Sequence, residues 1–165
     1  MPAPFDTPGR PWPVGAWNMP GWVEIPLTLT KNGHYHLEVE VGAERLNMIL
    51  DTGADNVTLD RKVVAERLKL PTNKVLTRGV GFGAGTVRLQ STSLPTLKIG
   101  SFESGPCDTS VTDLSNINEF GTRLGLPPVD GVLGASFLRA HKAVIDYPKH
   151  KLLLYDPTKA GDAKK

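Results

Sequence analysis

Hydrophobic and polar residues alternate along the first half of the chain with the period of a β-strand. Residues 22–30 place valine, isoleucine and leucine on one side and charged or hydroxyl residues on the other. Residues 34–41 alternate in the same way, and Lys31-Asn32-Gly33 between them carries the Asn-Gly pair typical of tight hairpins. This pattern predicts two half-buried strands that pair back on each other.

The rest of the pattern predicts more short strands and a few short helices. Strands are expected over 45–51, 57–59, 94–99, 105–111, 131–134, 143–147 and 151–155, with a hairpin over 75–90. Helices are expected over 61–68, 113–124 and 137–141, with Asp60, Asp113 and Ser136 as their N-caps. Phe102, Phe120 and Cys107 are expected in the core. The chain is therefore predicted to be mostly β, with two or three short helices.

The length of 165 residues fits one domain, and 14 prolines and 17 glycines favour tight turns over long helices. We expect a proline- and tryptophan-rich arm over 1–21, a folded domain over 22–155 and a polar, disordered tail over 156–165. Trp12, Trp17 and Trp22 lie in or beside the arm. They either pin it onto the core or form a docking surface for a partner.

Charge and cysteine content narrow the classes of function. The net charge is +2 without a basic stripe, which argues against nucleic acid as a partner. The single Cys107 excludes an internal disulfide and a thiolate metal cage. No stretch is apolar enough to span a bilayer, and residues 1–21 lack the apolar centre of a signal peptide. We therefore expect no membrane partner within this chain.

Two stretches carry candidate chemistry. In the first, Met48-Ile49-Leu50 runs directly into Asp51-Thr52-Gly53-Ala54-Asp55, so a buried strand delivers a carboxylate to a tight turn. In the second, Val129-Asp130-Gly131-Val132-Leu133-Gly134 again ends an apolar run with glycine. A glycine-rich run, Gly79-Val80-Gly81-Phe82-Gly83-Ala84-Gly85, lies between them.

These three elements, in this order, resemble the retropepsin-like (retroviral-type) aspartic proteases, in their bacterial branch. The family motif is two apolar residues, Asp, Thr or Ser, Gly, and Ala or Ser, followed later by two apolar residues and Gly before a short helix. The resemblance covers about residues 23–155. It implies a single-lobe, closed acid-protease barrel whose flap is the glycine-rich run. It leaves the location open between bacterial cytoplasm and periplasm.

The resemblance implies hydrolysis of peptide bonds in extended polypeptides by two carboxylates that share one proton and activate a water. This chain offers one candidate acid, because Asp108-Thr109-Ser110 lacks the glycine and Asp6-Thr7-Pro8 lies in the arm. The second carboxylate would come from Asp51 of another copy, so a homodimer is expected. No cofactor and no metal are expected. Site residues carried over are the catalytic Asp51, the supporting Thr52, Gly53, Val132, Leu133 and Gly134, and the substrate-binding Ala54, Asp55, Val80, Gly81, Phe82 and Gly83.

One departure from the family concerns Asp55. Retroviral enzymes follow the second glycine with an arginine that binds the aspartate four residues after the catalytic one, whereas this chain has Ala135. Arg139 or Arg123 are candidate substitutes. The terminal strands are also free to pair differently from the retroviral dimer.

Several alternatives to the interpretation as a protease stay open. The domain could be a catalytically weak module for dimerisation or peptide binding, Asp51 could be a structural turn residue, and the enzyme could remove its own arm. A phosphate-binding loop is disfavoured, because no Lys-Ser/Thr follows the glycines. His34 and His36 share a strand face but lack a third ligand, so two exposed histidines are expected there.

Overall fold

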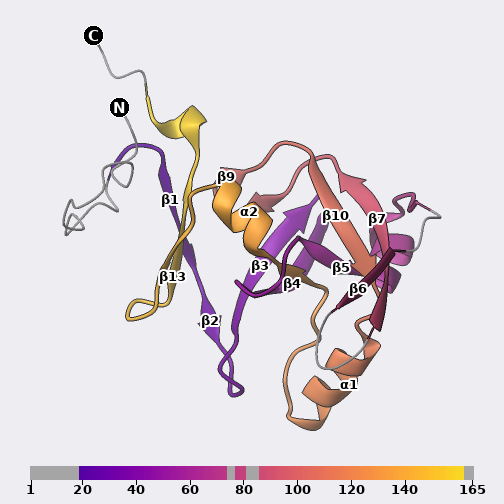
Figure 1. Cartoon of the computed structure of the whole chain (residues 1–165). Helices are drawn as coiled ribbons and strands as arrows, with labels where there is room; N and C mark the ends of the chain where they lie inside the picture. Colours follow the sequence, from indigo (N-terminus) through magenta and orange to yellow (C-terminus); the bar gives the residue numbers. More distant parts are fainter. Residues whose placement is uncertain (1–18, 74–76, 81–85, 162–165) are drawn as a thin grey trace.

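The structure, a computed structural model, describes residues 19–73, 77–80 and 86–161. Strands outnumber helices in the described chain and are arranged as one long curled sheet and one small sheet (Figure 1). The prediction of a mostly β fold is therefore confirmed. The arm up to residue 18 and the last four residues lie outside the described residues. No helix in the described ranges combines the length and apolarity needed to cross a bilayer.

The strands follow the predicted order closely. They are β1 (Trp22–Pro26), β2 (Thr28–Leu29), β3 (Tyr35–Val41), β4 (Glu44–Leu50), β5 (Thr58–Asp60), β6 (Thr77–Val80), β7 (Thr86–Leu94), β8 (Lys98–Ile99), β9 (Phe102–Glu103), β10 (Cys107–Thr112), β11 (Gly131–Leu133), β12 (Val144–Asp146) and β13 (Lys151–Tyr155). The strand predicted over 94–99 is wrong in its middle. Pro95 has no N–H to donate to a ladder, so β7 ends at Leu94 and β8 begins three residues after Pro95.

The larger sheet runs β6-β7-β10-β5-β11-β4-β3-β8-β9, with β2 paired to β3. Strand β11 lies between β4, with which it is parallel, and β5, with which it is antiparallel. The small sheet has the order β1-β13-β12 and stands beside the curled sheet at the left of Figure 1. The ends of the described chain meet there, since Asp156 donates its backbone N–H to the Gly21 carbonyl at 2.7 Å.

One apolar core joins the curled sheet to the small sheet. Its members include Leu46 and Met48 of β4, Leu133 of β11 and Leu152 of β13, all buried. Phe102 is in this core, as predicted, but Phe120 is 62% exposed and the prediction for it is wrong. A second, smaller cluster holds Ile49, Leu114 and Val129 on the outer face of β4, with Ile117 packed against it.

Helical segments fill the predicted places, but their caps differ. The helix predicted over 61–68 is present and widens into a π-helix, η2, over Val63–Leu68. The other helices are α1 (Ser115–Arg123), α2 (Ala135–Ala140) and a 3₁₀ turn, η3 (Pro157–Lys159).

The three predicted N-caps are wrong. Asp60 does not cap the helix after it; its Oδ1 accepts the Leu114 N–H at 2.9 Å and ties the start of the α1 segment to β5. Gly134, not Ser136, precedes α2, and Ser136 lies inside the helix. The N-cap of α1 is Leu114, not Asp113. Asp113 Oδ1 accepts the Ser115 N–H at 2.9 Å, and hydrogen bonds from the side chain and the backbone of Ser115 hold the pKa of Asp113 below its usual value.

The tail also departs from expectation at its beginning. Asp156 is buried, and its Oδ1 accepts the Thr158 N–H at 3.0 Å, which starts η3. Asp156 therefore belongs to the folded part of the chain rather than to a disordered tail. The carboxylate of Asp156 can be buried because it accepts hydrogen bonds from the backbone and the hydroxyl of Thr158.

Candidate active site

Asp51 follows β4 directly and is held from below by β11. The register of the parallel pair places Leu50 opposite Leu133. The pairing continues one residue further, because Asp51 donates its N–H to the Leu133 carbonyl at 3.1 Å. The backbone position of Asp51 is therefore fixed by the second apolar stretch, as the two motifs had suggested.

The turn after Asp51 is closed by its own side chain. The Asp51 Oδ1 accepts the Gly53 N–H at 2.8 Å, and the Ala54 N–H is 3.3 Å from the Asp51 carbonyl. Thr52, Gly53 and Asp55 are exposed, while Asp51 and Ala54 are half-buried. The turn thus presents a half-buried carboxylate, a hydroxyl and the backbone of Gly53 at the surface of the molecule.

Gly134 lies directly beneath this turn. The Ala135 N–H donates to the Ala54 carbonyl at 2.7 Å and the Ser136 N–H donates to the Asp55 carbonyl at 2.8 Å. A Cβ on Gly134 would lie 2.3 Å from the Asn56 carbonyl oxygen, closer than real Cβ contacts. Only glycine permits α2 to begin this close to the acid turn.

Val132 and Leu133 are buried in β11 and form the floor that carries these contacts. The predicted supporting residues Thr52, Gly53, Val132, Leu133 and Gly134 therefore lie together around Asp51. Among the predicted substrate-binding residues, Ala54 and Asp55 lie in the same turn, and Val80 ends β6. Gly81, Phe82 and Gly83 lie outside the described residues.

The expected arginine partner of Asp55 is not found. Among the described residues no ion pair joins the Asp55 carboxylate to Arg123 or Arg139. Asp55 is held through its backbone carbonyl instead, by the start of α2. This chain has alanine at position 135 instead of the family's arginine, and main-chain hydrogen bonds hold the turn there.

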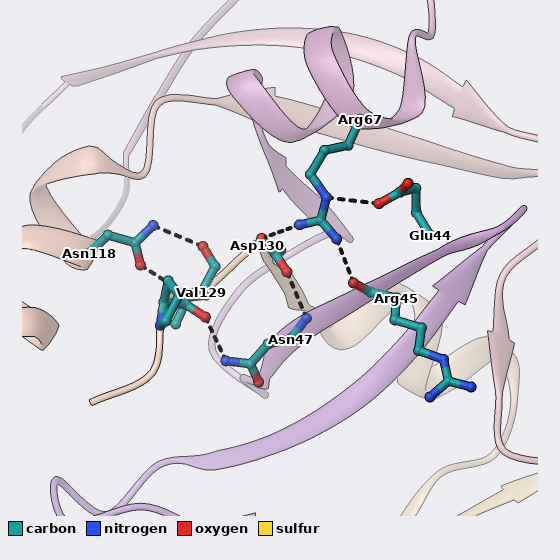
Figure 2. Close-up of polar contacts among 8 residues, drawn as sticks. Glu44, Arg45, Asn47, Arg67, Asn118, Val129 and Asp130 are labelled. Carbon is teal, nitrogen blue, oxygen red and sulfur yellow. Dashed lines mark hydrogen bonds and ion pairs between the residues drawn. The ribbon is translucent and has the colours of Figure 1, made fainter. Parts of the chain in front are cut away.

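A different arginine, Arg67 of η2, binds Asp130, the residue directly before β11 (Figure 2). Its Nε donates to Glu44 Oε2 at 2.9 Å, its Nη1 to Asp130 Oδ1 at 2.9 Å and its Nη2 to the Arg45 carbonyl at 2.6 Å. The bond to Glu44, opposed by partial burial and aided by Asp130, raises the pKa of Arg67. One guanidinium thus joins η2, the start of β4 and the residue before β11.

Asp130 and Asn118 extend the network in Figure 2 toward α1. Asp130 Oδ2 accepts the Asn47 N–H at 2.9 Å. Asn118 donates to the Val129 carbonyl at 2.9 Å and accepts the Val129 N–H at 2.7 Å. Sequence reasoning assigned none of these residues a role. Asp130 directly before the second motif was a visible signal, whereas the pairing of Asn118 with Val129 depends on folding.

His36 is buried, so the prediction of two exposed histidines on this face is wrong for one of them. Its Nδ1 lies 3.1 Å from Asn47 Oδ1. Burial lowers the pKa of His36, the Asn47 contact opposes this, and nearby His34 adds to the lowering. In the described part of the chain no three histidine, cysteine or acidic side chains gather as a metal site.

The fold and the acid turn define a class of protein. The structure is similar to a retropepsin-like aspartic protease from Rickettsia conorii, with a TM-score of 0.55 and 22% identity over 82% of this chain and 92% of that one. It also matches the retroviral protease-like domain of Ddi1 from Leishmania major, with a TM-score of 0.47 and 16% identity over 77% of this chain and 95% of that one. A third match is the EIAV protease in complex with the inhibitor HBY-793, with a TM-score of 0.45 and 25% identity over 72% of this chain and 98% of that one. The fold is retropepsin-like, as predicted.

A sequence profile described as aspartyl protease matches residues 37–137. The match runs from within β3 to within α2 and includes both motifs, so the chain belongs to the aspartyl protease family. No match was found among curated protein sequences.

Proposed function

We propose that the protein is an aspartic endopeptidase that hydrolyses peptide bonds of extended polypeptides. The observation that carries the proposal is the intact Asp51-Thr52-Gly53 turn, supported from beneath by β11 and exposed at Thr52 and Gly53. A carboxylate held this firmly at the surface is pre-organised for chemistry with a bound substrate. Family membership favours the same conclusion.

The reaction needs two carboxylates, and each copy supplies one such turn. In a twofold dimer the turns of two copies meet, so the two Asp51 side chains face each other across one water. Two carboxylates at that distance share one proton, because both cannot ionise cheaply. Thr52 would hydrogen-bond across the twofold axis and keep the two turns in register.

Hydrolysis then follows in two steps. The ionised Asp51 takes a proton from the water as its oxygen attacks the peptide carbonyl carbon, while the protonated Asp51 donates a hydrogen bond to the carbonyl oxygen. A proton passes to the nitrogen as the carbon–nitrogen bond breaks, and an acid and an amine are released. Gly53, Ala54 and Asp55 would hold the substrate backbone, and Val80, Gly81, Phe82 and Gly83 would close over it.

Cleavage of a peptide library from about pH 3 to about pH 7 tests the proposal, because a dyad sharing one proton favours the acidic side. Asp51→Asn is expected to lower kcat/KM by at least about 100-fold, since it removes the group that accepts the water's proton. Asp108→Asn is the matched control: Asp108 also precedes a threonine but is exposed in β10, so activity should be retained.

Dimer dependence gives a second measurement on the same samples. Activity per mole of wild type should rise with protein concentration, and added Asp51→Asn protein should inhibit by forming mixed dimers. Equal activity of wild type and Asp51→Asn would overturn the proposal. Peptide binding without cleavage at any concentration would instead assign the domain as a peptide-binding module.

A further inference from the structure

The small sheet has one face in the core and one face turned away from it. Strand alternation sends Leu152 and Leu154 of β13 into the main core, so Leu153 between them points to the opposite, outer face. Leu153 is nevertheless only 1% exposed. Among the described residues it belongs neither to the main core nor to the small cluster around Ile49. The core therefore does not account for the burial of this side chain.

The neighbours of Leu153 on the outer face cannot cover it alone. Its partners in the two ladders are Glu24 of β1, which is exposed, and Val144 of β12, which is half-buried. Trp22 and Tyr155 share this face at one end of the sheet, with their rings 5.4 Å apart. Side chains on one face stand roughly perpendicular to the sheet, so these neighbours shield the sides of Leu153 and leave its tip open. A second layer of chain is needed over this face.

The first turn of the described chain points back toward the small sheet. In Met19-Pro20-Gly21-Trp22, the Trp22 N–H donates to the Met19 carbonyl at 3.3 Å. Proline in the second place and glycine with a φ of 91° in the third place are typical of a type II turn. Such a turn reverses the chain, so it aims the segment before Met19 back along β1.

That segment has the composition and the length to cover the outer face. Residues 1–18 contain Phe5, Trp12, Trp17 and five prolines. In the extended form that prolines favour, 18 residues span roughly 56 Å, whereas a five-residue strand is only about 17 Å long. The four residues at the other end of the chain include one aspartate and two lysines, which are unsuited to burying a leucine. Leu153 is buried within a single copy, so its burial requires no partner.

We propose that residues 1–18 fold back over the outer face of the small sheet, with the rings of Trp12 and Trp17 packed on Leu153 and Val144. Flat aromatic rings and prolines pack well on a face that already carries Trp22. The arm is then a cover supplied by the same chain, and its tryptophans are not a docking surface for a partner. The inference does not depend on the proposed peptidase function.

Thiol labelling of a Leu153→Cys variant of the full chain tests the proposal. Cys107→Ser in the same chain removes the only natural thiol. The arm variant adds Trp12→Ala and Trp17→Ala to this background. These two changes are expected to raise the rate of labelling by iodoacetamide at least about 10-fold, because a thiol must be accessible to react.

Two controls separate loss of the cover from a change in reactivity. Trp12→Phe with Trp17→Phe keeps large rings in the arm and should retain slow labelling at Leu153→Cys. Leu29→Cys replaces a leucine of β2 that is 51% exposed, and it should be labelled equally fast with the arm intact or altered. Circular dichroism shows whether each variant is folded.

A second measurement needs no introduced cysteine. In the otherwise unchanged chain, Trp12→Ala with Trp17→Ala should lower the thermal midpoint by about 4 °C or more, because the sheet loses apolar contacts. Phe120→Ala is the matched control, since it removes an aromatic ring that is 62% exposed, and the midpoint should stay close to that of wild type.

Three results would overturn the proposal. Fast labelling of Leu153→Cys with the arm intact would show that the face is open in solution. Slow labelling that persists in a folded arm variant, with an unchanged thermal midpoint, would show that another segment covers Leu153. Protection that disappears on dilution would show that a second copy supplies the cover. None of these readouts uses peptide cleavage, so each leaves the proposed function untouched.

Discussion

At the scale of single residues, the acid turn depends on the absence of a side chain as much as on the carboxylate. The start of α2 approaches the turn so closely that Gly134 has the carbonyl oxygens of Asn56 and Ala54 where its Cβ would be. Gly131, one strand length earlier, is enclosed in the same way by the Thr58 carbonyl. The two glycines let β11 pass between β4 and β5 and reach beneath Asp51.

Gly134→Ala is therefore expected to destabilise the protein by about 1–3 kcal/mol or more, because backbone atoms rather than a flexible side chain must move. Urea unfolding measures the change in the free energy of unfolding. Gly105→Ala is the matched control, since a Cβ there would meet nothing within 4 Å. Equal midpoints for the two variants would contradict the close contact.

At the scale of elements, the Arg67 side chain links three segments of the chain through hydrogen bonds that are not part of a strand ladder. It joins η2 to Glu44 and the Arg45 carbonyl at the start of β4 and to Asp130 before β11. The side chain of Asp130 is only 18% exposed, so its charge depends on this partner and on the Asn47 N–H. The network keeps β11 beside β4 and, through Asn118, keeps α1 attached.

Replacing Arg67 by Met should lower the free energy of unfolding by about 1–3 kcal/mol, because Asp130 loses a partner while staying largely covered. Arg67→Lys should recover only part of this, since an ammonium cannot reproduce the three-way fork. Thermal or urea unfolding is the measurement.

Arg45→Met is the comparison for this series. Arg45 is a surface arginine whose nearest carboxylates, Glu38 and Glu40, lie at 3.7 and 3.9 Å. Exposed pairs of this kind contribute about 0–1 kcal/mol, so little change is expected. An Arg67→Met protein as stable as Arg45→Met would show that the network adds nothing to the fold.

At the scale of the whole molecule, two half-buried or buried histidines make stability depend on pH. Burial lowers the pKa of His36, in β3, and of His141, which follows α2. Asn47 opposes the shift at His36 and Asp156 opposes it at His141. The unfolded chain therefore binds more protons than the folded chain at pH values just below 6.5, the usual histidine pKa.

The sign of the effect follows from this difference. Stability is complete above the unfolded pKa and falls as the pH drops from there toward the lowered folded values. Urea midpoints at about pH 7.5 and about pH 5.5 should differ, and His36→Gln with His141→Gln should reduce the difference. His34→Gln, at an exposed position, should retain most of it. An unchanged difference in the double variant would contradict the assignment.

The sequence by itself determined the local parts of this protein. Alternation over 34–41 was sufficient for β3, because side-chain direction along a strand has a period of two. The Asp-Thr-Gly turn and the glycine at 134 were recognisable, because short-range chemistry and the close approach at a turn leave few residue choices. The mostly β class and the position of the acid after β4 followed from these local patterns.

Only the tertiary structure decided which distant residues meet. Asp60, a plausible cap by its place in the sequence, binds Leu114 instead, and His36 is buried with its Nδ1 3.1 Å from Asn47 Oδ1. Phe120 was expected in the core by its type, yet it is 62% exposed. Of the apolar side chains on α1, Ile117 is the one that packs against the small cluster of Ile49, Leu114 and Val129. These outcomes depend on contacts between segments far apart in sequence, and such contacts leave no periodic signal in either segment alone.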